Sequence, residues 1–162
     1  MSGYTEVLQV MGAMIIFSMV LTSTNRYILM NTQRQIESEV EMMAVSIAQD
    51  VIDDARLRAF DATTQNNQEP SQIPGGFTAP PFASANVADR SLINTFEGFH
   101  DYTEIEANNL GTFNIRCEVH YVQPGNLDQT SNIQTNHKRI RVTVTSDNLR
   151  NAVVVTFVRT YS

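Results

Sequence analysis

Helix-breaking residues are absent from a long N-terminal stretch of this chain. Neither glycine nor proline occurs between Ala13 and Glu69, and these two residues destabilise a helix interior by roughly 1 and 3 kcal/mol relative to alanine. This absence predicts a single helix over residues 1–60. About 55 helical residues at 1.5 Å each would extend roughly 80 Å, several times the width of a domain of this size. Most of the helix must therefore pack against something other than the rest of its own chain.

Basic residues and cysteines are also few. The 17 acidic residues outnumber the 11 basic ones, and the net charge of -6 argues against capture of nucleic acid or anionic lipid by charge. The single Cys117 forms neither an intrachain disulfide nor a zinc site by itself. Residues 1–6 contain no Lys or Arg, and no small-x-small cleavage pattern follows the apolar run after them. We therefore expect the N-terminal apolar run to be retained rather than removed as a secretory signal.

Signatures of catalysis and of cofactor binding are lacking as well. His100, His120 and His137 have no spacing typical of metal ligands. Gly75 and Gly76 lie among prolines instead of opening a helix, so they do not form a phosphate-binding loop. We expect no enzymatic activity, no cofactor and no metal site.

The chain begins instead with an apolar run from Val7 to Leu21, interrupted only by Gln9 and Ser18. This run is short for a membrane crossing, which needs about 20 residues. Tyr27 to Met30 extend the apolar character beyond the polar residues 22–26. A weak, dissociable span and a permanent signal anchor both fit this hydropathy.

The charges after the run bear on its orientation. Arg26 and Arg34 follow the run, and a positive-inside count places that side in the cytoplasm. We nevertheless expect the domain that follows the helix, the head, to lie outside the cytoplasm, because its sequence looks like that of an extracytoplasmic domain.

From Asn31 onward the predicted helix is amphipathic. Apolar side chains recur at intervals of three and four residues and form a stripe, while acidic residues occupy a solvated face. The stripe comprises Ile36, Val40, Met43, Ile47, Val51 and Ala55, and it is broadened by Ala44, Val45, Ala48 and Ile52. It is wider than the seam of a two-stranded coiled coil, and this width suits a sheet that lies across it.

Residues 61–90 are rich in proline, glycine and polar side chains. We expect no regular structure there, because proline lacks a backbone donor and restricts the preceding residue. We expect a loop that lies on a neighbouring subunit or faces solvent.

Residues 91–162 read as an antiparallel β head. After a short apolar turn, Phe113–Tyr121 and Lys138–Thr145 alternate apolar and polar side chains, and Ala152–Tyr161 forms a third strand. The second and third segments are joined by a connection of hairpin length. The expected fold class is α+β, with the sheet packed on the C-terminal half of the helix.

This architecture resembles the type IV pilins and pseudopilins of bacteria. The resemblance is carried by Gly3 followed by Tyr4, by Glu6 alone in an apolar environment, by the run from Val7 to Leu21 and by the amphipathic continuation to Phe60. The C-terminal antiparallel sheet completes it. The paired cysteines and the mid-helix proline of many pilins are absent.

The resemblance implies a ladle-shaped subunit. Its helix, apolar over residues 4–30 and amphipathic over residues 31–60, would anchor it in the inner membrane before assembly and then form the core of a filament on the bacterial cell surface. The implied partners are further copies of the chain and the pilus assembly machinery. A prepilin peptidase is a further implied partner, with a processing site at Gly3 and Tyr4.

The resemblance also implies an assembly surface on the helix. Its residues are Glu6, Val7, Val10, Met14, Phe17 and Leu21. Glu6 would pair with the terminal amine of a neighbouring subunit, since a lone carboxylate in an apolar helix is destabilising unless it is paired. A cut after Gly3 leaves Glu6 third rather than fifth as in the family, so either residues 1–3 are a vestigial leader or the chain is assembled uncut. A major pilin, a minor pilin or pseudopilin, and a non-polymerising anchored binding domain all fit this architecture.

Overall fold

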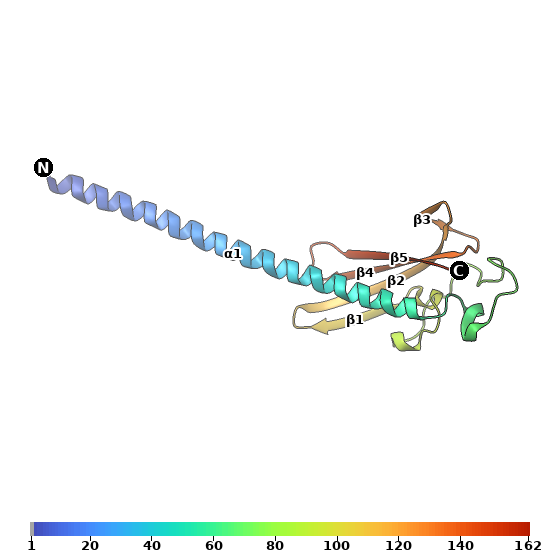
Figure 1. The fold of residues 1–162 in the computed structure, drawn as a ribbon. Helices are drawn as coiled ribbons and strands as arrows, with labels where there is room; N and C mark the ends of the chain where they lie inside the picture. The colour runs from blue at the N-terminus through green and yellow to red at the C-terminus, as the bar shows by residue number, and fades with distance from the viewer. Residues whose placement is uncertain (1) are drawn as a thin grey trace. The chain divides into compact units, whose positions relative to one another are not determined.

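The structure is a computed structural model that describes residues 2–162 and, within them, every side chain except those of Ser2 and Asn67. The chain divides into two compact units, one ending at Glu39 and the other comprising Val40–Ser162. A single helix, α1 (Ser2–Leu57), supplies all of the described first unit and continues into the second. Figure 1 shows α1 and the five strands of the sheet. The predicted α+β fold class is confirmed.

The end of α1 is set by hydrogen bonds from another part of the chain. No glycine or proline follows Leu57 directly. Instead, the backbone of Ala59 accepts a hydrogen bond from Phe96 N (2.9 Å) and donates one to the carbonyl of Asn94 (3.2 Å). These bonds replace the helical ones that the backbone of Ala59 would otherwise make. The helix therefore ends three residues before the predicted boundary at residue 60.

The second unit holds one hydrophobic core between α1 and the sheet. On the helix side, the buried residues follow the predicted spacing of three and four: Val40, Ala44, Ile47, Ala48, Val51, Ile52 and Ala55. Three of these are alanines, and small side chains let a sheet approach the helix backbone closely. The teal part of α1 lies against the strands in Figure 1.

The sheet is antiparallel throughout and has the order β1-β2-β4-β5, with β3 paired to β2. Its strands are β1 (Thr103–Asn108), β2 (Gly111–Gln123), β3 (Asn126–Ser131), β4 (His137–Ser146) and β5 (Val153–Thr160). In β2, alternate side chains from Phe113 to Tyr121 are buried, as are Ile140, Val142 and Val144 in β4. Cys117 is fully buried in this face, as its alternation with polar neighbours predicts. Burial raises the pKa of its thiol to about 12, so Cys117 is inert packing rather than a nucleophile.

Two strands and two apolar side chains differ from the expectation. The sequence predicts three strands, but β1 and β3 also join the sheet. Both are largely exposed, β3 is mostly polar, and the short alternation of Ile105 and Ala107 with polar neighbours in β1 does not form a buried face. Ile36 and Val45 were expected in the buried stripe, yet they are 52% and 47% exposed. Ile36 belongs to the first unit, and Val45 lies on a side of α1 that the core of the second unit does not cover.

Residues 61–90 contribute to the core of the second unit. Phe77 and Phe82 are buried, and Phe77 packs against Phe60 and Tyr161 with ring centroids 5.1 and 5.2 Å apart. Short 3-10 helices form at Ala62–Asn67, Arg90–Leu92 and Glu97–Phe99. The segment after α1 is therefore held on the head by its aromatic side chains.

Candidate functional site

The first candidate site is the apolar surface of α1 in the first unit. All of the predicted assembly residues of the apolar run lie on this helix and are more than half exposed: Val7, Val10, Met14, Phe17 and Leu21. The helix is long and apolar enough to cross a membrane, and its apolar part is not buried within the chain. Apolar side chains around a whole helix need an apolar environment outside the chain.

Hydroxyl groups in this segment are satisfied within the helix. Ser18, Thr22, Ser23 and Thr24 each donate a 2.8 Å hydrogen bond to the carbonyl four residues earlier. Hydroxyls that bond back to the helix carry little polarity into an apolar surrounding. The helix α1 is continuous through these residues. The apolar surface consequently runs on toward Met30, which is about 36 Å of helix from Val7 and enough for the roughly 30 Å core of a bilayer.

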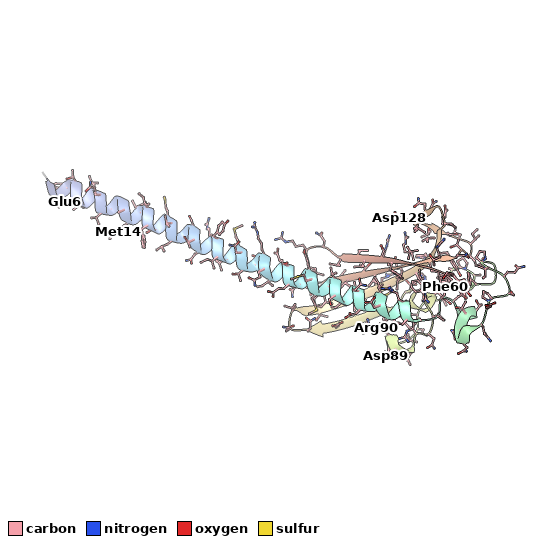
Figure 2. The ribbon with its side chains drawn as sticks, viewed as in Figure 1. Glu6, Met14, Phe60, Asp89, Arg90 and Asp128 are labelled. Atoms are coloured by element: carbon pink, nitrogen blue, oxygen red, sulfur yellow. The ribbon has the colours of Figure 1, made fainter. Side chains whose placement is uncertain are left out.

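Glu6 and the predicted processing site lie at the start of α1. Figure 2 shows Glu6 near the start of the helix and Met14 farther along it. Among the side chains that the structure describes, none forms a hydrogen bond or ion pair with the Glu6 carboxylate. Gly3 is helical and Tyr4 is 84% exposed, while Met1, part of the predicted leader, lies outside the described residues. The roles of Glu6, Gly3 and Tyr4 stay predictions.

The second candidate site is a buried cluster of charges in the second unit. Lys138 lies on β4, and its Nζ donates hydrogen bonds to Asp61 Oδ2 (2.5 Å), Glu97 Oε2 (2.8 Å) and the carbonyl of Phe60 (2.9 Å). The side chains of Lys138 and Asp61 are fully buried, and that of Glu97 is 7% exposed. Buried charges persist only when they are paired and hydrogen-bonded.

Aromatic rings enclose the Lys138 ammonium. Its Nζ lies 4.6 Å from the ring centroid of Phe60, 5.2 Å from those of Phe82 and Tyr121, and 6.0 Å from that of Phe77. Ring faces attract a cation and the attraction increases when water is excluded. The cluster is thus both closely paired and dry.

Asp61 is the most heavily hydrogen-bonded member. Its Oδ1 accepts bonds from the backbone N and hydroxyl of Thr63 and of Thr78, at 2.9 to 3.1 Å, and its Oδ2 also accepts from the Tyr121 hydroxyl at 3.3 Å. Burial by itself would raise the pKa of Asp61, but the hydrogen bond and charge of Lys138, together with the bonds from Thr63 and Thr78, hold it below its usual value. Asp61 is therefore ionised.

Glu97 behaves in the opposite way. Burial raises the pKa of its carboxyl above the usual 4.5, the Asp61 charge adds to this effect, and the Lys138 charge offsets only part of it. Its Oε1 accepts a 2.6 Å hydrogen bond from the backbone N of Ala62. Of the two carboxyls that face Lys138, Glu97 is thus the one that more readily holds a proton.

We expect Glu97→Gln to change how the stability of the protein depends on pH. The folded-state pKa of Glu97 is raised, so its contribution to stability is present below the unfolded value of about 4.5 and is lost as the pH rises through the folded value. The free energy of unfolding of the wild type should therefore fall relative to that of Glu97→Gln between pH 4 and pH 7. Urea unfolding at both pH values measures this difference.

The matched control for this comparison is Glu106→Gln, which changes an exposed carboxylate on β1. Its unfolding free energy should follow that of the wild type at both pH values. If the free energies of unfolding of the wild type and Glu97→Gln differ by the same amount at pH 4 and pH 7, the raised pKa of Glu97 is contradicted.

A third place where titratable groups meet is a histidine pair. The rings of His100 and His120 have centroids 5.1 Å apart and face a groove of about 430 Å³ that Phe82 and Tyr121 also line. Burial lowers the pKa of His120, and the neighbouring His100 lowers it further. Within residues 2–162, no three His, Cys, Asp or Glu side chains converge as a metal site requires.

The Lys138 cluster was not predicted, although the sequence holds a signal for it. Lys138 is the only lysine of the chain. Because side chains alternate along a strand, it lies on the same face of β4 as the inward-facing Ile140, Val142 and Val144. A lysine at an inward position requires a buried anion. Asp61 and Glu97 come from segments that carry no periodic pattern, so their positions beside Lys138 follow only from the tertiary structure.

Comparison with known proteins assigns no family to this chain. No protein-family model, no curated protein and no solved structure matches it significantly. The similarity to the pilins therefore rests on architecture: one long apolar N-terminal helix, and an antiparallel sheet that packs on the later part of that helix.

Proposed function

We propose that this chain is a structural subunit that polymerises through its apolar N-terminal helix into an extracellular filament of the type IV pilus kind, on the surface of a bacterial cell. The subunit is held in the inner membrane by the same helix before assembly. It is not an enzyme, and its main partners are further copies of itself and the machinery that assembles them.

One observation carries this proposal. The apolar side chains of α1 before Met30 are exposed on all sides of the helix, whereas the apolar side chains after Val40 are buried by the sheet. Burying several hundred Å² of that exposed surface per subunit contributes on the order of 10 kcal/mol before the entropic terms of association, at about 25 cal/mol per Å². This driving force is sufficient for polymerisation.

The same helix supports a second candidate function. Because it is long and apolar enough to cross a membrane, it also suits a non-polymerising domain anchored at the membrane surface. A pseudopilin or minor pilin of a secretion system is a variant of the filament proposal. The two classes differ in whether the helix leaves the lipid to pack against other copies.

Microscopy of sheared material tests the proposal. Cells that produce the chain are sheared, and the released fraction is examined by negative stain and by mass spectrometry of the subunit N-terminus. Thin fibres made of this chain are the expected result, and the mass shows whether residues 1–3 are removed. Monomer confined to the membrane, without fibres, would favour the anchored domain.

Glu6→Ala is expected to lower the fibre yield in this assay by about tenfold or more, which corresponds to a loss of roughly 1.4 kcal/mol of association free energy. The reason is that an apolar helix packed among copies tolerates a carboxylate only beside a cation, and the neighbouring terminal amine would be lost as its partner. Glu41→Ala, on the exposed side of α1 in the second unit, is the matched control and should give the wild-type yield. Normal fibre yield from Glu6→Ala, with both variants folded by circular dichroism, would remove Glu6 from the assembly surface.

A further inference from the structure

The only lysine of this chain is fully buried. Lysine is rarely fully buried, because its ammonium is strongly hydrated, yet Lys138 has no exposed surface. The ammonium is bonded to two carboxyls at once, Asp61 at 2.5 Å and Glu97 at 2.8 Å. An amine and a carboxyl pressed together beside a second carboxyl, in a dry site, are the reactants for amide formation.

We infer that Lys138 and Asp61 condense into an intramolecular isopeptide bond between Nζ and Cγ, with Glu97 as the proton carrier. Reacting atoms held about 3–3.5 Å apart in the correct orientation gain much of the rate that an intramolecular reaction has over a bimolecular one. The hydrogen bond from Nζ to Asp61 Oδ2 places the amine next to the carbon that this oxygen is bonded to. The rings of Phe60, Phe82 and Tyr121 restrict the movement of the amine.

The two oxygens of Asp61 are placed for different roles. Oδ1 is surrounded by the backbone N–H and hydroxyl groups of Thr63 and Thr78, which would stabilise the negative charge that develops when the amine adds to the carbonyl carbon. Oδ2 lies next to Nζ and the Tyr121 hydroxyl, and it shares the backbone N–H of Thr78 with Oδ1 at 3.1 Å. Oδ1 therefore becomes the amide oxygen, and Oδ2 is the oxygen that leaves.

The step balances without any further reactant. The ammonium gives one proton to Oδ2, and the electron pair of the neutral amine then attacks Cγ to form the N–C bond. The nitrogen releases a second proton to Glu97 Oε2, which passes it to Oδ2. The Cγ–Oδ2 bond breaks, one water leaves, and the amide keeps the third proton of the original ammonium. Nothing is oxidised or reduced.

The surroundings favour this chemistry. Burial raises the pKa of Glu97, which makes its carboxylate a better proton acceptor than an exposed glutamate. Condensation also turns a buried ion pair into a neutral amide, and neutral groups are far less destabilising in a dry interior than charges.

The bond would join the segment directly after α1 to strand β4, across 77 residues of sequence. Such a link constrains the unfolded chain as a disulfide does, in a chain whose single cysteine forms none. The inference concerns the second unit alone and holds whether or not the chain polymerises.

Intact-mass spectrometry of the full-length wild-type protein, purified in detergent and denatured before measurement, tests the inference. The expected mass is about 18 Da below that of the linear sequence, because one water is lost. Digestion should release one branched peptide pair containing Asp61 and Lys138. A full mass after prolonged incubation of the folded protein would overturn the inference.

A second readout uses the fact that Lys138 is the only lysine. In the denatured cross-linked protein, an amine-reactive reagent should label the N-terminus alone, and a lysine-specific protease should leave the chain uncut. Labelling and cleavage at Lys138 in wild-type protein that had been incubated folded and then denatured would overturn the inference independently of the mass.

Three variants separate the roles. Asp61→Asn should still cross-link but lose about 17 Da, because ammonia leaves in place of water, while Lys138→Met should keep its full mass. Glu97→Gln keeps the shape of the side chain but cannot carry the proton, so it should stay folded by circular dichroism and keep its full mass. Cross-linking of Glu97→Gln at the wild-type extent would remove Glu97 from the mechanism.

Discussion

Met14→Asp is expected to abolish filaments and membrane insertion together. Met14 lies near the middle of the exposed apolar surface of α1 and is 65% exposed. An aspartate at the centre of a membrane helix raises the insertion free energy by about 2.5–3.5 kcal/mol. In a filament core the same charge would be buried without a partner. Sheared fractions viewed by negative stain, together with fractionation of the membranes, measure both effects.

Two control variants separate the effect of a charge at position 14 from the effects of changing Met14 and of adding a charge elsewhere on the helix. Met14→Leu preserves the apolar character and should assemble like the wild type. Met42→Asp places the same charge on an exposed methionine of the same helix within the second unit, where Met42 is 62% exposed, and should also be tolerated. Filaments from Met14→Asp in wild-type amounts would contradict a core built from N-terminal helices. Equal loss with Met42→Asp would point to a general effect of charge on the helix.

Relative to wild-type protein in which Lys138 and Asp61 are still an ion pair, Lys138→Met is expected to destabilise the second unit by about 3–5 kcal/mol, the usual effect of removing one partner from a buried ion pair; relative to cross-linked wild type, loss of the covalent link adds to this difference. Methionine fills much of the same space, so the loss is mainly electrostatic. Asp61 and Glu97 would remain buried without their cation, and the surrounding rings would lose their contact with the charge. Guanidinium unfolding of the full-length protein in detergent, followed by the signal of the buried tyrosines, measures the difference.

The matched control is Arg141→Met, which changes an exposed cation on the same strand and should alter stability by less than about 0.5 kcal/mol. Adding Asp61→Asn and Glu97→Gln to Lys138→Met removes the unpaired charges and should restore part of the lost stability. Wild-type stability for Lys138→Met would show that the cluster does not hold the head together. If the triple variant is no more stable than Lys138→Met alone, the stability lost in Lys138→Met is due to packing and not to unpaired charges.

The helix and the central strands could be predicted because their signals are local. The absence of glycine and proline between Ala13 and Glu69 leaves the helix as the most stable conformation of that stretch. Alternation in β2 and β4 gives the period of two that a half-buried strand requires. In β1 and β3 both faces are largely polar or exposed. Their pairing with β2 depends on hydrogen bonds to that partner strand, and no local sequence pattern predicts those bonds.

The proposed assembly surface could be predicted from the sequence, whereas the Lys138 cluster could not. The apolar run from Val7 to Leu21 is continuous in sequence, so its exposure on one helix follows from the sequence and the helix period alone. Lys138, Asp61 and Glu97 come from β4, from the segment after α1 and from a short 3-10 helix. No spacing rule connects them, because each is brought to the site by a different part of the core.

The sequence by itself determined a long helix, apolar first and amphipathic later, and a sheet with one buried face, because helix propensity and side-chain periodicity act between near neighbours. Only the tertiary structure decided where α1 ends, which apolar residues the sheet covers and which carboxyls meet the single lysine. These outcomes depend on hydrogen bonds and packing between distant segments, as between Ala59 and Phe96 or Asp61 and Lys138. Their free energies arise only once the core has formed.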